Sequence, residues 1–121
     1  MSHVVEEVLA LWKDAFDRHQ PDRMADVFTS DALFQGFGPS VVTGREAVRS
    51  YYRTVADGRR AEFTVLHSYT IGADAVGGFA DVTFSGASKP EVKVHMSLVL
   101  LHGAEGWKIR QYHVSRVSAQ D

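Results

Sequence analysis

Apolar residues recur at helical spacing near the start of the chain and at strand spacing in its second half. Val5, Val8, Leu9, Trp12 and Phe16 follow the three-and-four-residue period of a helix, with charged residues between them. This pattern predicts an amphipathic helix over residues 4–19, whose apolar side faces the core.

Two further helices are predicted from their boundary signals. Pro21 can occupy the first turn of a short helix that follows the first one. Thr43, followed by Glu46 three residues later, has the pattern of a capping box and predicts a helix that ends near residues 57–58. Ser2 is the corresponding N-cap candidate for the first helix.

From Ala61 onward the apolar period changes to two, which predicts strands over residues 62–71, 75–85, 91–101 and 107–117. Short turn segments separate them, so each neighbouring pair can form an antiparallel hairpin. Gly77 and Gly78 lie inside the second strand, where they predict a bulge that bends the sheet. Helices followed by a strand meander predict an α+β domain with its helices on one face of a curved sheet.

Composition narrows the class of protein. The 121 residues fit a single domain over 1–121, with 45% hydrophobic and 23% charged residues. Without cysteine there can be no disulfide, thiolate zinc site or cysteine nucleophile. A net charge of −2 without a basic run argues against a nucleic-acid partner. We see neither a signal-peptide pattern nor a membrane span, so we expect a cytoplasmic protein with no membrane partner.

The last strand points to a site. Trp107 and Ile109 alternate on one strand face with Gln111, His113 and Ser115. An apolar face that becomes polar predicts a core that opens into a lined small-molecule cavity. A neutral imidazole at His113 could carry a proton there, and Gln111 could donate to a carbonyl or enolate oxygen. The alternatives are a histidine that fixes the sheet and a glutamine at its surface.

His95, Ser97 and Asp81 could complete this catalytic site. His95 and Ser97 share one face of the strand over residues 91–101, and His95 neighbours His113 if that face is the cavity side. With the opposite parity, His95 lies at a subunit contact. Asp81 either pairs with an imidazole or is exposed. Because these residues lack a metal-ligand spacing, and no phosphate-binding glycine loop is present, we expect neither a metal nor a cofactor.

Aromatic residues are the predicted walls of the cavity and make its ligand largely apolar. On the helix over residues 44–57, one tyrosine should point at the cavity mouth while the other packs in the core. The candidate substrate-binding residues are Trp12, Phe16, Phe34, Phe37, Tyr51, Tyr52 and Ser97.

The sheet carries apolar residues on more than the face that the helices cover. Val92, Val94, Met96, Leu98 and Leu100 alternate on a single strand face. Because a chain of this length has too few helices to cover both faces, we expect a homodimer through the outer sheet face.

In this order and spacing, several short motifs resemble the nuclear transport factor 2-like superfamily, and within it the SnoaL-like branch (polyketide cyclase or ketosteroid isomerase-like). The motifs are Trp12 with Phe16, Pro21-Asp22, Phe28-Thr29-Ser30-Asp31-Ala32, Thr43-Gly44-Arg45-Glu46-Ala47-Val48 leading into Tyr51-Tyr52, Gly106-Trp107-Lys108-Ile109, and His113-Val114-Ser115. They span essentially the whole chain. The ending is also similar to that of the kinase association domain in the same superfamily.

The resemblance implies a cone-shaped, cystatin-like α+β fold. In it a strongly curved antiparallel sheet packs on three helices, with an internal pocket at the open end, usually in a homodimer. It also implies a function: a cofactor-free acid–base isomerase, cyclase or dehydratase acting on a small apolar carbonyl compound. The alternatives are a non-catalytic ligand-binding protein and an oligomerisation or interaction module of the same fold, because fold alone does not select an activity.

Overall fold

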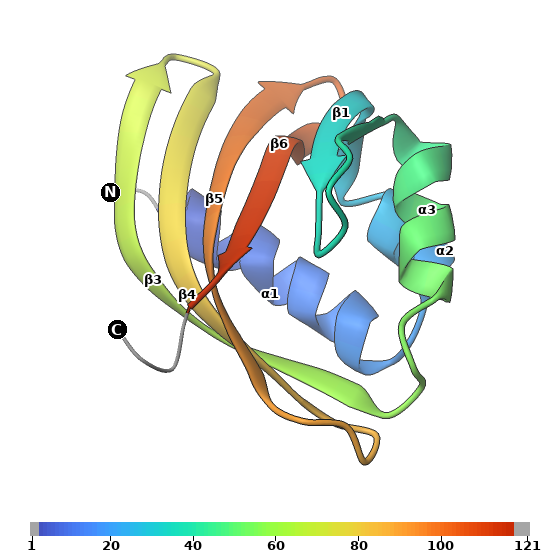
Figure 1. Ribbon diagram of the computed structural model, residues 1–121. Coiled ribbons are helices and arrows are strands. Elements are labelled where there is room, and N and C mark those ends of the chain that lie inside the picture. Colours follow the sequence, from blue (N-terminus) through green and yellow to red (C-terminus); the bar gives the residue numbers. More distant parts are fainter. Residues whose placement is uncertain (1–2, 118–121) are drawn as a thin grey trace.

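A six-stranded sheet curves over the long first helix in the computed structural model, which describes residues 3–117 (Figure 1). The helices are α1 (Val4–Asp17), α2 (Pro21–Ala25) and α3 (Arg45–Arg53). The strands are β1 (Phe28–Gln35), β2 (Val42–Thr43), β3 (Arg59–Gly72), β4 (Ala75–Gly86), β5 (Val92–Gly103) and β6 (Gly106–Arg116). The strand order is β2-β1-β6-β5-β4-β3; β1 and β6 pair in parallel, and the other neighbouring pairs are antiparallel. The predicted α+β class with helices on a curved sheet is confirmed.

The core lies between α1 and the inner face of the sheet. The apolar stripe predicted for α1 is buried, and Trp12 and Leu9 are fully covered. From β5, Val94, Met96, Leu98 and Leu100 are buried in the same core. The β5 row therefore packs on the helices, and the prediction that it adds to the outer face is wrong. The outer face carries the alternate residues of each strand.

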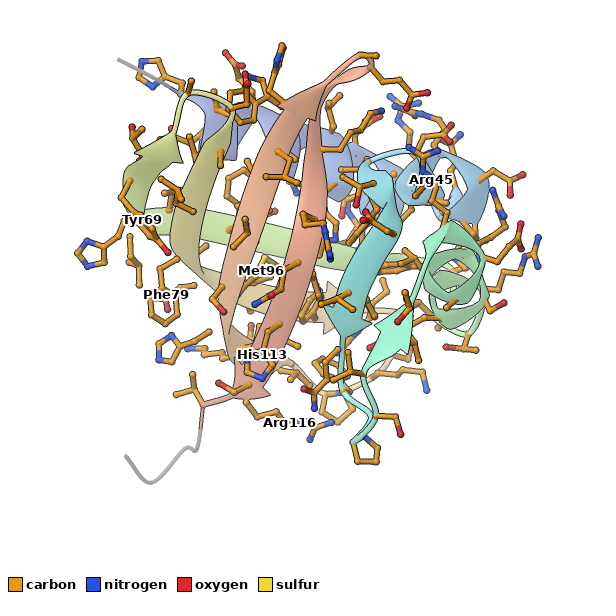
Figure 2. All side chains as sticks on the ribbon, turned by 90° about the horizontal axis from the view of Figure 1, so that it is seen from above. Arg45, Tyr69, Phe79, Met96, His113 and Arg116 are labelled. Atoms are coloured by element: carbon orange, nitrogen blue, oxygen red, sulfur yellow. The ribbon has the colours of Figure 1, made fainter. Side chains whose placement is uncertain are left out.

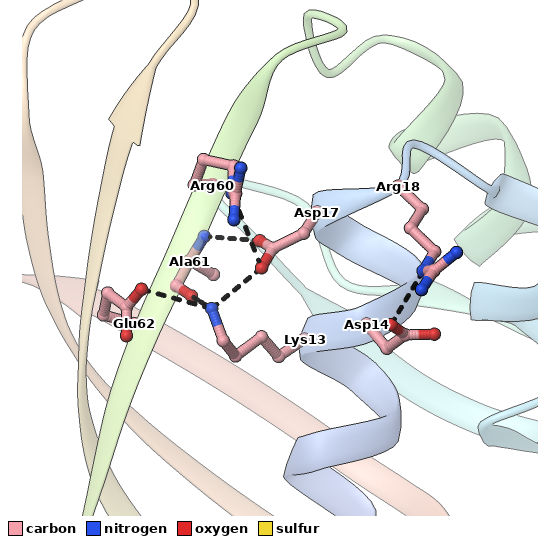
Figure 3. Close-up of polar contacts among 7 residues, drawn as sticks. All are labelled: Lys13, Asp14, Asp17, Arg18, Arg60, Ala61 and Glu62. Carbon is pink, nitrogen blue, oxygen red and sulfur yellow. Dashed lines mark hydrogen bonds and ion pairs between the residues drawn. The ribbon is translucent and has the colours of Figure 1, made fainter.

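Polar contacts fasten the end of α1 to the start of β3 (Figure 3). Asp17 accepts a hydrogen bond from the backbone N–H of Ala61 at 2.9 Å. Lys13 donates to Asp17 at 2.8 Å, to the Ala61 carbonyl at 2.5 Å and to Glu62 at 3.2 Å. Burial lowers the pKa of Lys13, but the hydrogen bonds and charges of these two carboxylates outweigh that effect and raise it. The contacts fix where β3 crosses α1.

The predicted cap of α3 is not formed. Helix α3 begins after Gly44, which has φ 94° and makes no side-chain cap, and Thr43 instead pairs with Leu33 in the short β1–β2 ladder. A positive φ suits glycine, so the turn into α3 is set by Gly44 rather than by a capping box. Ser2, the predicted cap of α1, lies outside the described residues.

The bulges of the sheet lie at positions other than the predicted one. Strand β4 pairs with β5 without interruption through Gly77 and Gly78, so no bulge occurs there. The register instead shifts in β3, between Val65 and His67. It shifts again in β6, where Leu100 pairs with Ile109 but the preceding Val99 pairs with Gln111.

Candidate ligand-binding cavity

A cavity of about 550 Å³ lies between the end of α3, the β4–β5 turn and the end of β6. Its volume is in the range of small-molecule sites. Buried aromatic side chains form the floor: Phe16 from α1, Tyr52 from α3, Phe84 from β4 and Tyr112 from β6. The remaining lining residues are Phe37, Tyr51, Thr54, Val55, Ala56, Arg59, Lys89, Pro90, Val92, Val114 and Arg116.

Two buried hydroxyls meet at the floor. The Tyr52 oxygen accepts a hydrogen bond from the indole N–H of Trp12 at 3.0 Å, and the Tyr52 and Tyr112 hydroxyls bond to each other. Burial, the largest effect, raises the pKa of both phenols well above their ordinary value. Both groups therefore stay protonated at neutral pH and act as hydrogen-bonding groups rather than as bases.

Tyr51 stands closer to the mouth. Its ring occupies the space beside Gly36 where any side chain would collide, and its oxygen accepts a hydrogen bond from the Phe37 N–H at 3.0 Å. The loop after β1 is thus fastened to α3 through this tyrosine. No described residue accepts the Tyr51 hydroxyl proton, which leaves a donor beside the cavity.

The predicted catalytic residues of β6 point away from the cavity. Because Arg110 is the extra residue of the bulge, the alternation reverses after Ile109, and Tyr112 and Val114 face inward. Gln111 and His113 are exposed on the outer face, as Figure 2 shows for the His113 side chain. The prediction that they share the inner face with Trp107 and Ile109 is therefore wrong.

The other two predicted catalytic residues meet on that outer face. His95 Nδ1 lies 2.7 Å from the Asp81 carboxylate across the β4–β5 ladder, and both side chains are about half exposed, at 48% and 52%. Ser97 pairs with His113 in the β5–β6 ladder. The predicted catalytic residues therefore lie near one another, but on the face of the sheet opposite to the cavity.

The predicted cavity walls divide in two. Phe16, Phe37, Tyr51 and Tyr52 line the cavity as expected. Trp12 and Phe34 are fully buried among the core aromatics and do not line it, and Ser97 lies on the outer face.

Sequence reasoning missed Tyr112, Val114, Arg59 and Arg116, although one signal for the first two was available. In β6 the apolar residues Trp107 and Ile109 fall on one parity, whereas Tyr112 and Val114 fall on the other. A change of parity inside one strand is what a bulge produces. The two arginines lie at strand ends, and the apolar period does not predict where a strand end lies in the folded sheet.

No group of three or more potential metal-ligating side chains occurs within residues 3–117. In the same part of the chain, no helix combines the length and the apolar character needed to cross a membrane.

The comparisons identify the family. The family model of the SnoaL-like domain matches residues 5–120, so the chain belongs to the SnoaL-like domain family, as the motifs predicted. No curated protein matches the chain in sequence.

Three solved structures share the fold at low identity. A ketosteroid isomerase-like protein from Erwinia carotovora atroseptica is 18% identical over 95% of this chain and 95% of that chain, with a TM-score of 0.80. A candidate calcium/calmodulin-dependent protein kinase II association domain from Xanthomonas campestris is 16% identical over 96% and 87%, with a TM-score of 0.82. A candidate dehydratase of the NTF2-like family from Streptomyces avermitilis is 17% identical over 95% and 94%, with a TM-score of 0.76.

Proposed function

We propose that this protein binds a small, largely apolar molecule in the cavity beneath α3 and does not act on it by acid–base chemistry. The observation that carries the proposal is the lining itself. Aromatic rings and phenol hydroxyls surround the cavity, but its described lining contains no histidine, aspartate or glutamate. A ligand can be buried and oriented there, whereas a proton acceptor that works near neutral pH is missing.

The cofactor-free isomerase, cyclase or dehydratase expected from the sequence needs such an acceptor. His113, Gln111, His95 and Asp81 were its candidates, and all four are exposed on the outer sheet face. A group must reach the reacting atom within hydrogen-bond distance to act as a general base. The binding function, which the sequence left open as an alternative, therefore has the stronger support.

Native mass spectrometry of the protein from the cells that make it tests the proposal. We expect a retained small molecule that is released unaltered. Ala56→Trp places a large side chain in the lining at a half-buried position and should abolish retention. The matched control is Asp57→Trp, which changes the exposed neighbour outside the lining and should retain the ligand. Equal retention by both variants would place the ligand elsewhere, and release of a chemically altered molecule would favour catalysis.

We also propose that the outer sheet face joins two copies of the chain. Large apolar side chains are exposed there, with Phe79 at 44% and Tyr69 at 56%, and both project from the sheet in Figure 2. Exposed apolar side chains grouped on one face are typical of an interface. Sedimentation velocity should find a dimer that Phe79→Lys dissociates, while Ala10→Lys, at an exposed position of α1 away from the sheet, is the control. A wild-type monomer at micromolar concentration would refute the proposal.

A further inference from the structure

Arg59 is a buried cation whose partners are all uncharged. Its side chain lines the cavity and the residue is only 8% exposed. One terminal nitrogen donates to the carbonyls of Gly86 at 2.9 Å and Lys89 at 3.3 Å, and the other donates to Pro90 at 2.7 Å. These bonds hold the β4–β5 turn but do not neutralise the guanidinium, because no described carboxylate forms an ion pair with it. A buried charge without a counter-ion is unusual.

Two further cations stand at the mouth of the same cavity. Lys89 and Arg116 are exposed lining residues, and neither pairs with a carboxylate in the described part of the chain. The Arg116 guanidinium lies 4.9 Å from the centroid of the Phe37 ring, a cation–π contact that holds it at the mouth without consuming its charge. Arg116 also acts on Tyr51: burial raises the pKa of that phenol, while the Phe37 N–H and the arginine charge oppose the rise.

Elsewhere on the protein, most cations are neutralised by a neighbour. The residues that pair with carboxylates are Lys13, Arg18, Arg23, Arg45, Arg49, Arg53, Arg60 and Arg110. The chain as a whole is slightly acidic, with a net charge of −2. Positive charge without a carboxylate partner is therefore concentrated at this cavity, against the overall balance of the chain.

We infer that the ligand of this cavity is an organic anion: a carboxylic acid with an aromatic or alicyclic body, bound with its carboxylate toward Arg116, Lys89 and Arg59. The inference rests on the proposed binding function and adds the class of ligand. The apolar body fits against Phe16, Tyr52 and Phe84, while the carboxylate accepts charge-assisted hydrogen bonds. The free Tyr51 hydroxyl proton is a further donor on the same side.

A pair of isosteric probes separates the charge from the apolar body. We would titrate the ¹⁵N-labelled protein with 2-naphthoate and with 2-naphthamide, and follow the amide resonances of Val55 and Val114 as reporters of the cavity. We expect naphthoate to bind about tenfold more tightly than naphthamide, because only the carboxylate forms ion pairs with the cations. Added salt should weaken naphthoate binding alone.

Charge-removing variants then locate the effect. Arg116→Gln and Lys89→Gln should each weaken naphthoate binding about threefold, as expected of partly exposed ion pairs, and weaken naphthamide binding less. Both residues are exposed, so these variants should fold. Lys93→Gln is the matched control, because Lys93 is an exposed cation of β5 outside the lining.

The outcomes distinguish the two proposals. Equal affinity for the two probes, or equal losses of both probes in the variants, would overturn the anion inference while leaving a cavity that binds apolar molecules. If neither probe shifts the cavity resonances, the binding function falls as well.

Discussion

Replacing Tyr52 by phenylalanine is the most direct probe of the hydrogen-bonded floor of the cavity. The change removes the oxygen that accepts from the Trp12 indole at 3.0 Å and that bonds to the Tyr112 hydroxyl. All three side chains are buried, so water cannot readily replace the lost partner. Leaving a buried donor without an acceptor costs about 1–3 kcal/mol. We expect Tyr52→Phe to lower the free energy of unfolding by about 2 kcal/mol, mid-range for such a loss.

A double-mutant cycle assigns that loss to the indole contact. Trp12→Phe removes the indole donor. In that background, Tyr52→Phe no longer leaves a buried indole N–H without an acceptor. The two losses should therefore sum to about 1 kcal/mol more than the loss of the double variant. Urea unfolding followed by far-ultraviolet circular dichroism measures all four proteins. Losses that add within about 0.5 kcal/mol would refute the reasoning.

Tyr51→Phe is the matched control for this cycle. Its oxygen also accepts one hydrogen bond, from the Phe37 N–H, but that bond is exposed and water can replace it. We expect a loss of less than about 1 kcal/mol, the scale of a net hydrogen bond. A loss equal to that of Tyr52→Phe would mean that burial does not set the cost.

Three further predictions concern pH, the outer face and packing. Because burial raises the pKa of Tyr52 and Tyr112 above the unfolded value, their contribution to stability is complete below about pH 10 and is lost at higher pH. Absorbance at 295 nm of a Tyr51→Phe/Tyr69→Phe variant, in which Tyr52 and Tyr112 are the remaining tyrosines, should therefore report their ionisation together with unfolding, and ionisation with intact circular dichroism would contradict this. His113→Ala should change stability by less than about 0.5 kcal/mol and leave ligand retention intact; lost retention would return His113 to the site. Gly78→Ala, whose Cβ would lie 2.9 Å from an α1 side chain, should cost about 1–3 kcal/mol in urea unfolding. Gly77→Ala meets only an exposed tyrosine ring that can move, so a greater loss there would refute the packing argument.

Periodicity was sufficient to predict the main elements. The α1 stripe around Trp12 has the helical period over several turns, and the last four strands have period two between clear turns. These signals are strong because, within each element, every apolar position of the pattern indicates the same buried face. They predicted the class of fold and the aromatic nature of the cavity through Phe16 and Tyr52.

The side chains of Gln111 and His113 were predicted on the wrong face because one residue changed the parity of β6. Arg110 adds a single step to the strand, and every side chain after it faces the opposite side. Simple alternation from Trp107 and Ile109 would place His113 on the inner face. With the extra residue, His113 is exposed on the outer face instead. The apolar residues Tyr112 and Val114 indicated the true inner face of this part of β6, because a strand at the edge of a core buries its apolar side chains.

The cavity arginines could not have been predicted in the same way. Arg59 and Arg116 lie far apart in sequence, at the start of β3 and at the end of β6, and they line one cavity only because the sheet curves. That curvature depends on long-range pairing and on bulges whose positions local sequence does not specify. Gly77 and Gly78 illustrate the difficulty: they accommodate close side chains instead of forming the predicted bulge.

The most direct test of the central claim is a crystal structure of the protein soaked with 2-naphthoate. Ligand density should lie against the rings of Tyr52 and Tyr112, with the carboxylate toward Arg116. Density beside the His95–Asp81 pair on the outer sheet face, with the cavity filled by water alone, would contradict the account.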